Sequence, residues 1–256
     1  AWMQSLNYMD DQTEPGSVIM SWWDYGYWFE SIGRRPAVAD GGNAGYYTDQ
    51  RFGKTNYPLA DYFTATSPNK TQNLFRKHSV DYIVLDNSMI GKYSAVSQIS
   101  NRDNSQFKSM LTLSSRRSVR KARNGILAFS SGRLGISVLA PIKRTGGGVE
   151  FSTSKPAILE TSRGRIPIGC VLTEEGIKHI ENVSRAASYC IAEDPFRSLD
   201  RSLKTGGRAK LIMVPRSIAR ANLVRLYLMD GHGIPYVEKI PEASNGYVKM
   251  WKVDFE

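Results

Sequence analysis

The pattern of residues changes near position 110, and this change limits the folds that the chain can adopt. Upstream, helical and extended segments alternate: a helix begins at Ser67-Pro68, the strand Val80–Leu85 follows it, and Met89–Ile99 is helical again. Downstream, the apolar runs are short, rich in β-branched or aromatic residues, and separated by Gly, Ser and Arg. Such runs are typical of antiparallel strands. The sequence therefore predicts an α+β fold, in which a mixed α/β core carries an interleaved antiparallel β-rich subdomain.

The same pattern predicts three segments. Residues 1–110 should form the core subdomain, and residues 111–210 a β-rich peripheral segment with one helix, which Thr173 would cap and which would end near Cys190. Residues 211–256 should return to the core with a helix over Ser217–Met229 and two strands joined near Asn245. The Gly-, Asn- and Tyr-rich stretch from 40 to 57 is expected to be a long functional loop.

Charge and cysteine content leave several questions open. The chain has 34 basic and 24 acidic residues, a net charge of +10, which favours a polyanionic partner or an anionic surface. Part of the positive charge is concentrated in a basic cluster within residues 116–123, which would be either a solvated face or a contact for phosphate groups. The cluster consists of Arg116, Arg117, Arg120, Lys121 and Arg123. The two cysteines, Cys170 and Cys190, lack the spacing of a zinc site, and either a disulfide or two buried thiols would fit. No apolar run is long enough to span a membrane, and without an initiator Met the chain is expected to be a piece of a longer protein.

The most specific feature for function is a block of adjacent tryptophans followed by a carboxylate, an aromatic residue and a glycine. Indole N–H groups only donate hydrogen bonds, whereas an ionised Asp only accepts them. Side by side, these groups could hold one hydroxyl as both donor and acceptor. The block consists of Trp22, Trp23, Asp24, Tyr25 and Gly26.

This block resembles the WWDYG signature of the catalytic subunit of oligosaccharyltransferase, the enzyme of asparagine-linked glycosylation. A second pattern of the archaeal family members, DxxMxxKxxxI, is similar to a stretch downstream, where Val96 stands in place of Ile. The matching residues would share one helical face after Asp86; they are Met89, Lys92 and Val96. The resemblance covers roughly residues 1–100 and 215–253.

The resemblance implies a function and a set of binding residues. The chain would be the acceptor-recognition domain of a glycosyltransferase that moves a lipid-linked oligosaccharide to Asn-x-Ser/Thr. The WWDYG block would read the Ser/Thr hydroxyl, Met89 and Val96 would contact a threonine methyl, and Lys92 would orient Asp24 or the peptide backbone. No catalytic residue is expected in this chain, and the fragment alone should be inactive.

The resemblance also implies partners and a location. A divalent cation, Mn or Mg, would bind in an N-terminal membrane region outside this chain, and none would bind here. The partners would be the acceptor polypeptide, the lipid-linked donor and that membrane region, without nucleic acid. The full-length protein would lie in the cell membrane, with this domain on the extracytoplasmic face.

Two other functional classes remain as alternatives. A carbohydrate-binding module would stack sugars on exposed aromatic residues such as Trp22, Trp28, Tyr46 and Tyr47, without any need for peptide. A basic nucleic-acid-binding domain would show affinity that falls steeply with salt. The chain also contains Asn-x-Ser/Thr triplets at Asn69 and Asn182, which are possible glycosylation sites of its own.

Overall fold

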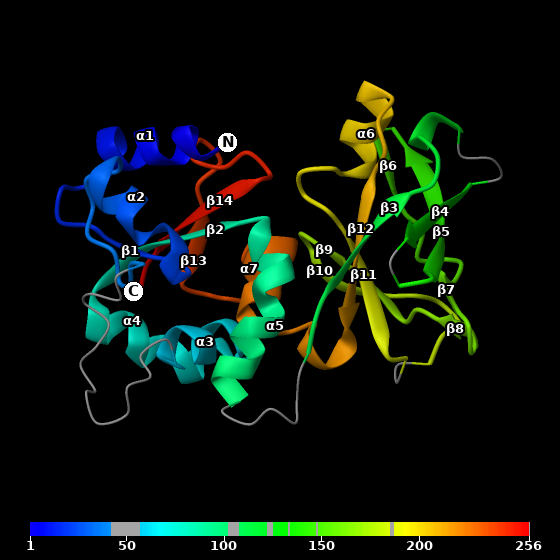
Figure 1. The fold of residues 1–256 in the computed structure, drawn as a ribbon, viewed down its shortest axis with the longest axis horizontal. Helices are drawn as coiled ribbons and strands as arrows, with labels where there is room; N and C mark the ends of the chain where they lie inside the picture. Colours follow the sequence, from blue (N-terminus) through cyan, green and yellow to red (C-terminus); the bar gives the residue numbers. More distant parts are fainter. Residues whose placement is uncertain are drawn as a thin grey trace. The chain divides into compact units, whose positions relative to one another are not determined.

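The chain folds into two compact units (Figure 1). The computed structural model describes residues 1–41, 57–101, 108–121, 125–132, 134–146, 148–184 and 187–255. Unit 1 consists of 1–108 and 220–256, and unit 2 of 109–219. The sequence-based boundaries were 110 and 211. Most of the predicted loop 40–57 lies outside the described residues. The mixture of helices and strands in both units confirms the predicted α+β class.

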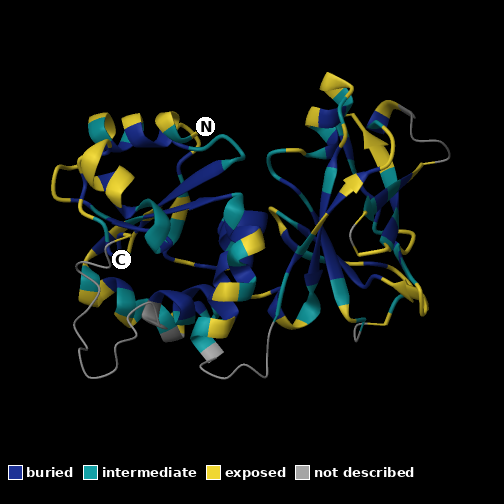
Figure 2. Ribbon diagram, viewed as in Figure 1, coloured by how far each residue is buried: buried dark blue, intermediate teal, exposed yellow. Residues whose placement is uncertain are grey.

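Unit 1 is built on a small mixed sheet with helices packed around it. In its described part the strand order is β1-β2-β14-β13, with β1 parallel and β14 antiparallel to β2. Figure 2 shows that the sheet is largely buried, whereas the helices expose their outer faces. The elements are α1 Trp2–Gln12, β1 Val18–Met20, η1 Trp23–Tyr25, α2 Gly26–Ser31, α3 Tyr57–Thr64, η2 Pro68–Thr71, α4 Gln72–His78, β2 Val80–Asp86, α5 Ser88–Asn101, α7 Asn222–Met229, β13 Val237–Lys239 and β14 Val248–Val253, where η marks a 3₁₀ helix.

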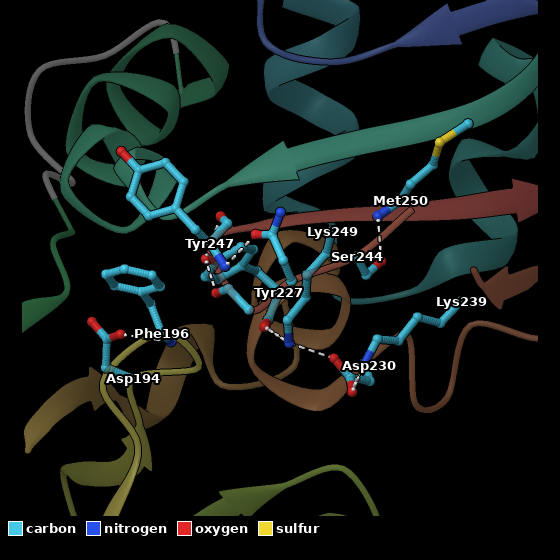
Figure 3. Close-up of polar contacts among 11 residues, drawn as sticks. Asp194, Phe196, Tyr227, Asp230, Lys239, Ser244, Tyr247, Lys249 and Met250 are labelled. Atoms are coloured by element: carbon cyan, nitrogen blue, oxygen red, sulfur yellow. Dashed lines mark hydrogen bonds and ion pairs between the residues drawn. The ribbon is translucent and has the colours of Figure 1, made fainter. Parts of the chain in front are cut away.

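A buried ion-pair network fixes the end of α7 to β14 (Figure 3). Lys249 is only 4% exposed, and its Nζ donates to the backbone oxygen of Tyr227 at 2.8 Å and to the Asp230 carboxylate. Asp230 ends the helix in the left-handed conformation and also pairs with Lys239. A buried ammonium group is tolerated only when it is paired and hydrogen-bonded. These contacts therefore hold the last turn of α7 against the sheet.

Unit 2 is β-rich, as predicted. Its main strands run in the order β10-β9-β11-β12-β3-β4-β5-β7-β8 and pair antiparallel, except that β11 is parallel to β9; β6 pairs with β5. The elements are β3 Leu111–Ser115, η4 Val119–Lys121, β4 Ile126–Ser131, β5 Ile136–Thr145, β6 Gly148–Phe151, β7 Ile158–Thr161, β8 Gly164–Pro167, β9 Cys170–Thr173, β10 Gly176–His179, β11 Tyr189–Glu193, α6 Leu199–Thr205, β12 Lys210–Pro215 and η5 Arg216–Ile218.

The predicted helix from Thr173 to Cys190 is wrong. Thr173 pairs with Gly176 in a hairpin between β9 and β10, and Cys190 lies in β11. Gly176 has a φ of 112°, which a helix does not contain. The residues Thr-Glu-Glu that resemble a helix start instead form a turn between two short strands. The α-helix in the described part of this unit is α6, which follows β11.

Two smaller predictions also need correction. The C-terminal helix was placed over Ser217–Met229, but α7 begins at Asn222, after the 3₁₀ turn η5. The helical spacing of this segment predicts that Ile218 and Val224 are buried, and both side chains are buried. The sequence Arg35-Pro36-Ala37-Val38-Ala39 also predicts a short strand, but what forms there is a single parallel bridge between Ala37 and Ile19.

A disulfide joins Cys170 and Cys190, which settles the alternative that the sequence left open. The two residues are direct neighbours across the parallel strands β9 and β11. The link closes the segment that contains the β9–β10 hairpin. Disulfides persist in oxidising compartments and are rare in the cytosol.

Glu193 should make unit 2 less stable as the pH rises. Burial, together with the nearby carboxylates of Asp200, Glu150 and Glu174, raises its pKa to about 7, although the Leu199 N–H donates to it. Because its pKa is higher in the folded state, its stabilising contribution is complete below about pH 4.5 and is lost as the pH rises through 7. Glu193→Gln should therefore raise the free energy of unfolding by about 1–2 kcal/mol at pH 8 and by much less at pH 4.5.

Hydrogen exchange of peptides covering β11 and β12 can measure this effect, because all five tryptophans lie in unit 1 and their fluorescence does not report on unit 2. If Glu193→Gln changed the free energy of unfolding equally at pH 8 and pH 4.5, the raised pKa of Glu193 would be contradicted.

Candidate functional site

The two sequence motifs meet because they follow neighbouring parallel strands. The WWDYG block comes directly after β1, and Asp86 is the last residue of β2, which leads into α5. β1 and β2 pair in parallel, with Met20 opposite Ile83, so their carboxyl ends lie at the same edge of the sheet. Ligands commonly bind at this edge in α/β sheets. The fold therefore brings both motifs to a position typical of a binding site.

An ion pair between Asp24 and Lys92 joins the two motifs directly. The Lys92 ammonium contacts Oδ2 of Asp24 and donates to the Tyr25 hydroxyl at 3.2 Å, and it lies 4.8 Å from the centre of the Tyr25 ring. Burial opposes the charge of Lys92, but the hydrogen bonds to Asp24 and Tyr25 outweigh it and raise the Lys92 pKa. The side chains of Lys92 and Asp24 are 30% and 25% exposed, so both can be reached from solvent. A carboxylate has several acceptor positions, so Asp24 can bind a further donor while it contacts Lys92.

Tyr25 connects this pair to a buried carboxylate below it. Its hydroxyl donates to Asp86 Oδ2 at 3.0 Å and lies 2.9 Å from Ser88 Oγ, which itself donates to Asp86 Oδ1 at 2.7 Å. Asp86 is 1% exposed, and burial raises its pKa despite these hydrogen bonds. Burial likewise raises the pKa of Tyr25. Ser88 was not among the predicted site residues; its position at the first residue of α5, two residues after Asp86, is the signal that could have identified it.

The two tryptophans of the block face different environments. Trp22 is 3% exposed and packs against Phe63, whereas Trp23 is only partly buried and begins the 3₁₀ turn η1. Burial of Trp22 excludes it as a sugar-stacking platform in this conformation. Of the other aromatic residues considered for that role, Trp28 is 42% exposed, and Tyr46 and Tyr47 lie outside the described residues.

Met89 and Val96 lie on the inner side of α5. Both have no exposed surface, whereas Lys92 reaches the surface from the same helix. In this conformation neither apolar side chain can contact a peptide on the surface. Their burial against the body of unit 1 fixes the helix from which Lys92 projects.

An aromatic cluster borders the site on the side of α1 and α2. The rings of Trp2 and Tyr25 lie 4.4 Å apart, and Trp28 packs edge-on against Trp2 at 5.4 Å. The side chains of Trp2 and Tyr25 are partly buried. The cluster therefore limits the freedom of the Tyr25 ring, whose hydroxyl belongs to the polar network.

The remaining predicted sites lie elsewhere. Asn69 lies in η2 of unit 1, and Asn182 lies in a turn of unit 2. Within the basic cluster, Arg120 donates to the backbone oxygens of Leu203 and Lys204 at 2.8 and 2.7 Å, where α6 ends. It thus caps that helix. Arg123 and the side chain of Lys121 lie outside the part of the chain that the structure describes.

Two properties of the described ranges bear on cofactors and membranes. They contain no group of three or more His, Cys, Asp or Glu residues that could hold a metal ion. No helix in these ranges is long and apolar enough to cross a membrane.

The first half of the chain is similar to a known protein family. Residues 15–137 match the model of the STT3/PglB/AglB core domain, a range that includes both motifs. Over 100 residues the chain is 30% identical to dolichyl-phosphooligosaccharide-protein glycotransferase 1 of Pyrococcus horikoshii; the alignment covers 38% of this chain and only 9% of that relative. The matched stretch therefore spans only a small part of that relative's length.

Solved structures show the same fold over the whole chain. The C-terminal domain of C. jejuni PglB superposes with a TM-score of 0.56 at 13% identity, covering 99% of both chains. The C-terminal globular domain of the Pyrococcus abyssi oligosaccharyltransferase superposes with a TM-score of 0.55 at 15% identity, covering 98% of this chain and 50% of that one. Over residues 15–137, a range that includes both motifs, this chain is therefore similar to the STT3/PglB/AglB core domain, and it shares the fold of the C-terminal domains of oligosaccharyltransferases.

Proposed function

We propose that this chain is the acceptor-recognition domain of a protein that transfers a lipid-linked oligosaccharide to asparagine, and that it reads the hydroxyl of Ser or Thr in Asn-x-Ser/Thr. The observation that carries this proposal is the Asp24–Lys92 pair, which unites the two motifs at one accessible position. The similarity to the Pyrococcus horikoshii relative, a dolichyl-phosphooligosaccharide-protein glycotransferase, supports the donor and acceptor classes.

In this proposal each polar group has a separate task. Asp24 accepts the hydroxyl proton of the substrate, and the indole N–H of Trp23 donates to the hydroxyl oxygen. Lys92 holds the Asp24 carboxylate in place, and Tyr25 and Ser88 tie that arrangement to the buried Asp86. Trp22, Met89 and Val96 support the site from within the core, since their side chains are buried. This packing role replaces the direct methyl contact expected for Met89 and Val96.

The proposal places transfer chemistry outside this chain. The divalent cation and the donor would bind in a membrane region that precedes it, and the domain would lie on the extracytoplasmic face. The Cys170–Cys190 disulfide supports that face, because it requires an oxidising environment. Incubating this chain with an Asn-x-Ser/Thr peptide and a lipid-linked oligosaccharide should give no glycopeptide. Formation of glycopeptide by the isolated chain would contradict the proposal that the transfer chemistry lies outside it.

Peptide binding tests hydroxyl reading directly. An Asn-x-Thr peptide should bind this chain at least about tenfold more tightly than the matching Asn-x-Val peptide, because Val has the same shape but leaves Asp24 without its donor. Chemical-shift perturbation of the Trp23 indole signal during titration measures both affinities. An Asn-x-Ser peptide serves as the control that retains the hydroxyl. Equal affinity for the Thr and Val peptides would overturn the proposed function.

A further inference from the structure

The first of the chain's two Asn-x-Ser/Thr triplets is part of a helical segment. Asn69 and Thr71 lie in the 3₁₀ helix η2, which runs directly into α4. The Thr71 hydroxyl donates to the Pro68 oxygen at 2.9 Å and accepts from the fully buried Asn222 at 3.3 Å. A transferase that reads the Thr71 hydroxyl would have to unwind this turn and deprive Asn222 of a partner. Removing the partner of a buried polar group is costly.

The second triplet has a different structure. Asn182 lies in a turn between β10 and β11, and both Asn182 and Ser184 are exposed. Asn182 has a φ of 57°, a left-handed conformation that Asn tolerates, so its side chain leaves the surface at a tight bend. On its N-terminal side the triplet follows an anchored residue, because Glu181 N–H donates to Thr153 O at 2.9 Å. Within the turn, Ala187 N–H donates to Ser184 O at 3.0 Å. The triplet therefore stands on the surface next to an anchored residue.

The position of this turn in the chain also indicates its compartment. Asn182 lies within the segment that the Cys170–Cys190 disulfide closes. A disulfide there means that this segment matures in an oxidising environment. Exposed Asn-x-Ser/Thr triplets become acceptors for N-linked glycans in such environments.

We propose that Asn182 is an N-glycosylation site of this chain itself, and that Asn69 stays unmodified in the folded protein. The inference rests on the proposed function in one respect, which is that a transferase of this family modifies the chain. In the reaction, Asn182 Nδ2 forms a bond to the anomeric carbon of a saccharide linked to a lipid phosphate. The bond from that carbon to the phosphate oxygen breaks and leaves its electron pair on the phosphate, while Nδ2 releases one proton.

Mass spectrometry of the protein purified from its own host tests this proposal. Trypsin should release residues 179–185 and residues 55–70 as separate peptides, because cleavage follows Lys178, Arg185, Lys54 and Lys70. The 179–185 peptide should carry a saccharide on Asn182, and the 55–70 peptide should not carry one on Asn69. Complete coverage with an unmodified Asn182, or a saccharide on Asn69, would overturn the proposal.

Three variants produced in the same host separate recognition from folding. Ser184→Ala should lower occupancy of Asn182 more than about tenfold, and Ser184→Thr should restore it, since only the hydroxyl is required. Asn182→Asp should abolish modification without straining the turn, because Asp also tolerates the left-handed conformation. Unchanged occupancy in Ser184→Ala would contradict the proposal. A modified Asn182 together with hydroxyl-independent peptide binding would instead refute only the function proposed above.

Discussion

Replacing Asp24 by alanine should lower transfer to an Asn-x-Thr peptide about 100-fold in the complete protein that carries this chain, a loss of roughly 3 kcal/mol. Two effects combine in this estimate. The substrate hydroxyl loses a charge-assisted acceptor worth about 2 kcal/mol, and the Lys92 ammonium, held by Asp24 and Tyr25, loses its main partner. Initial rates of glycopeptide formation at several peptide concentrations provide the measurement.

A surface carboxylate provides the matched control for this substitution. Asp11 is exposed at the end of α1, so Asp11→Ala should leave the rate within about twofold of the unmodified protein. Lys92→Met should lower the rate by less than Asp24→Ala, because it removes the group that orients the acceptor but leaves the acceptor in place. A rate for Asp24→Ala equal to that for Asp11→Ala would rule out the hydroxyl-reading role of Asp24.

Replacing Gly26 by alanine should destabilise unit 1 by about 3 kcal/mol or more, and part of the protein should fail to fold. A Cβ at this position would lie 2.3 Å from the backbone oxygen of Ala39 and 2.5 Å from Cα of Asp40. Because backbone atoms cannot rotate away as a side chain can, either α2 or the segment at 39–40 must move. Urea unfolding followed by tryptophan fluorescence measures the effect, since every tryptophan lies in unit 1.

Gly91 offers a control for the same chemical change. It lies in α5, and a Cβ there would meet nothing within 4 Å. Gly91→Ala should therefore stabilise unit 1 by up to about 1 kcal/mol through better helix propensity. A similar unfolding midpoint for the Gly26→Ala and Gly91→Ala proteins would show that the close packing at Gly26 does not contribute to the stability of unit 1.

Both predictions start from the same short block but concern different properties. Asp24 is partly exposed, so its replacement should impair recognition while the fold survives. Gly26 is buried, so its replacement should impair the fold and recognition together. Comparing unfolding and transfer in both variants therefore separates the binding role of the block from its packing role.

Local patterns predicted most elements of unit 1 because the determining interactions are near in sequence. A continuous apolar run identifies the strand Val80–Leu85, which is β2, and the Ser67-Pro68 start identifies the helical segment that precedes it. In unit 2 the same kind of reasoning failed at Thr173, where residues typical of a helix start form a hairpin turn. Pairing with β11 stabilises that hairpin, and a pairing between distant segments leaves no local signal.

The sequence by itself determined the α+β class, the change of architecture near residue 110 and the identity of the two motifs. Only the tertiary structure decided how these residues are arranged. Parallel pairing of β1 with β2 brings Asp24 to Lys92, and packing of α5 buries Met89 and Val96 while it leaves Lys92 accessible. It also decided that the two cysteines form a disulfide, and that the Asn69 triplet lies in a 3₁₀ helix whereas Asn182 lies in a turn. The physical reason is that residue types and their spacing record local preferences, whereas burial and polar contacts depend on which distant segments pack together.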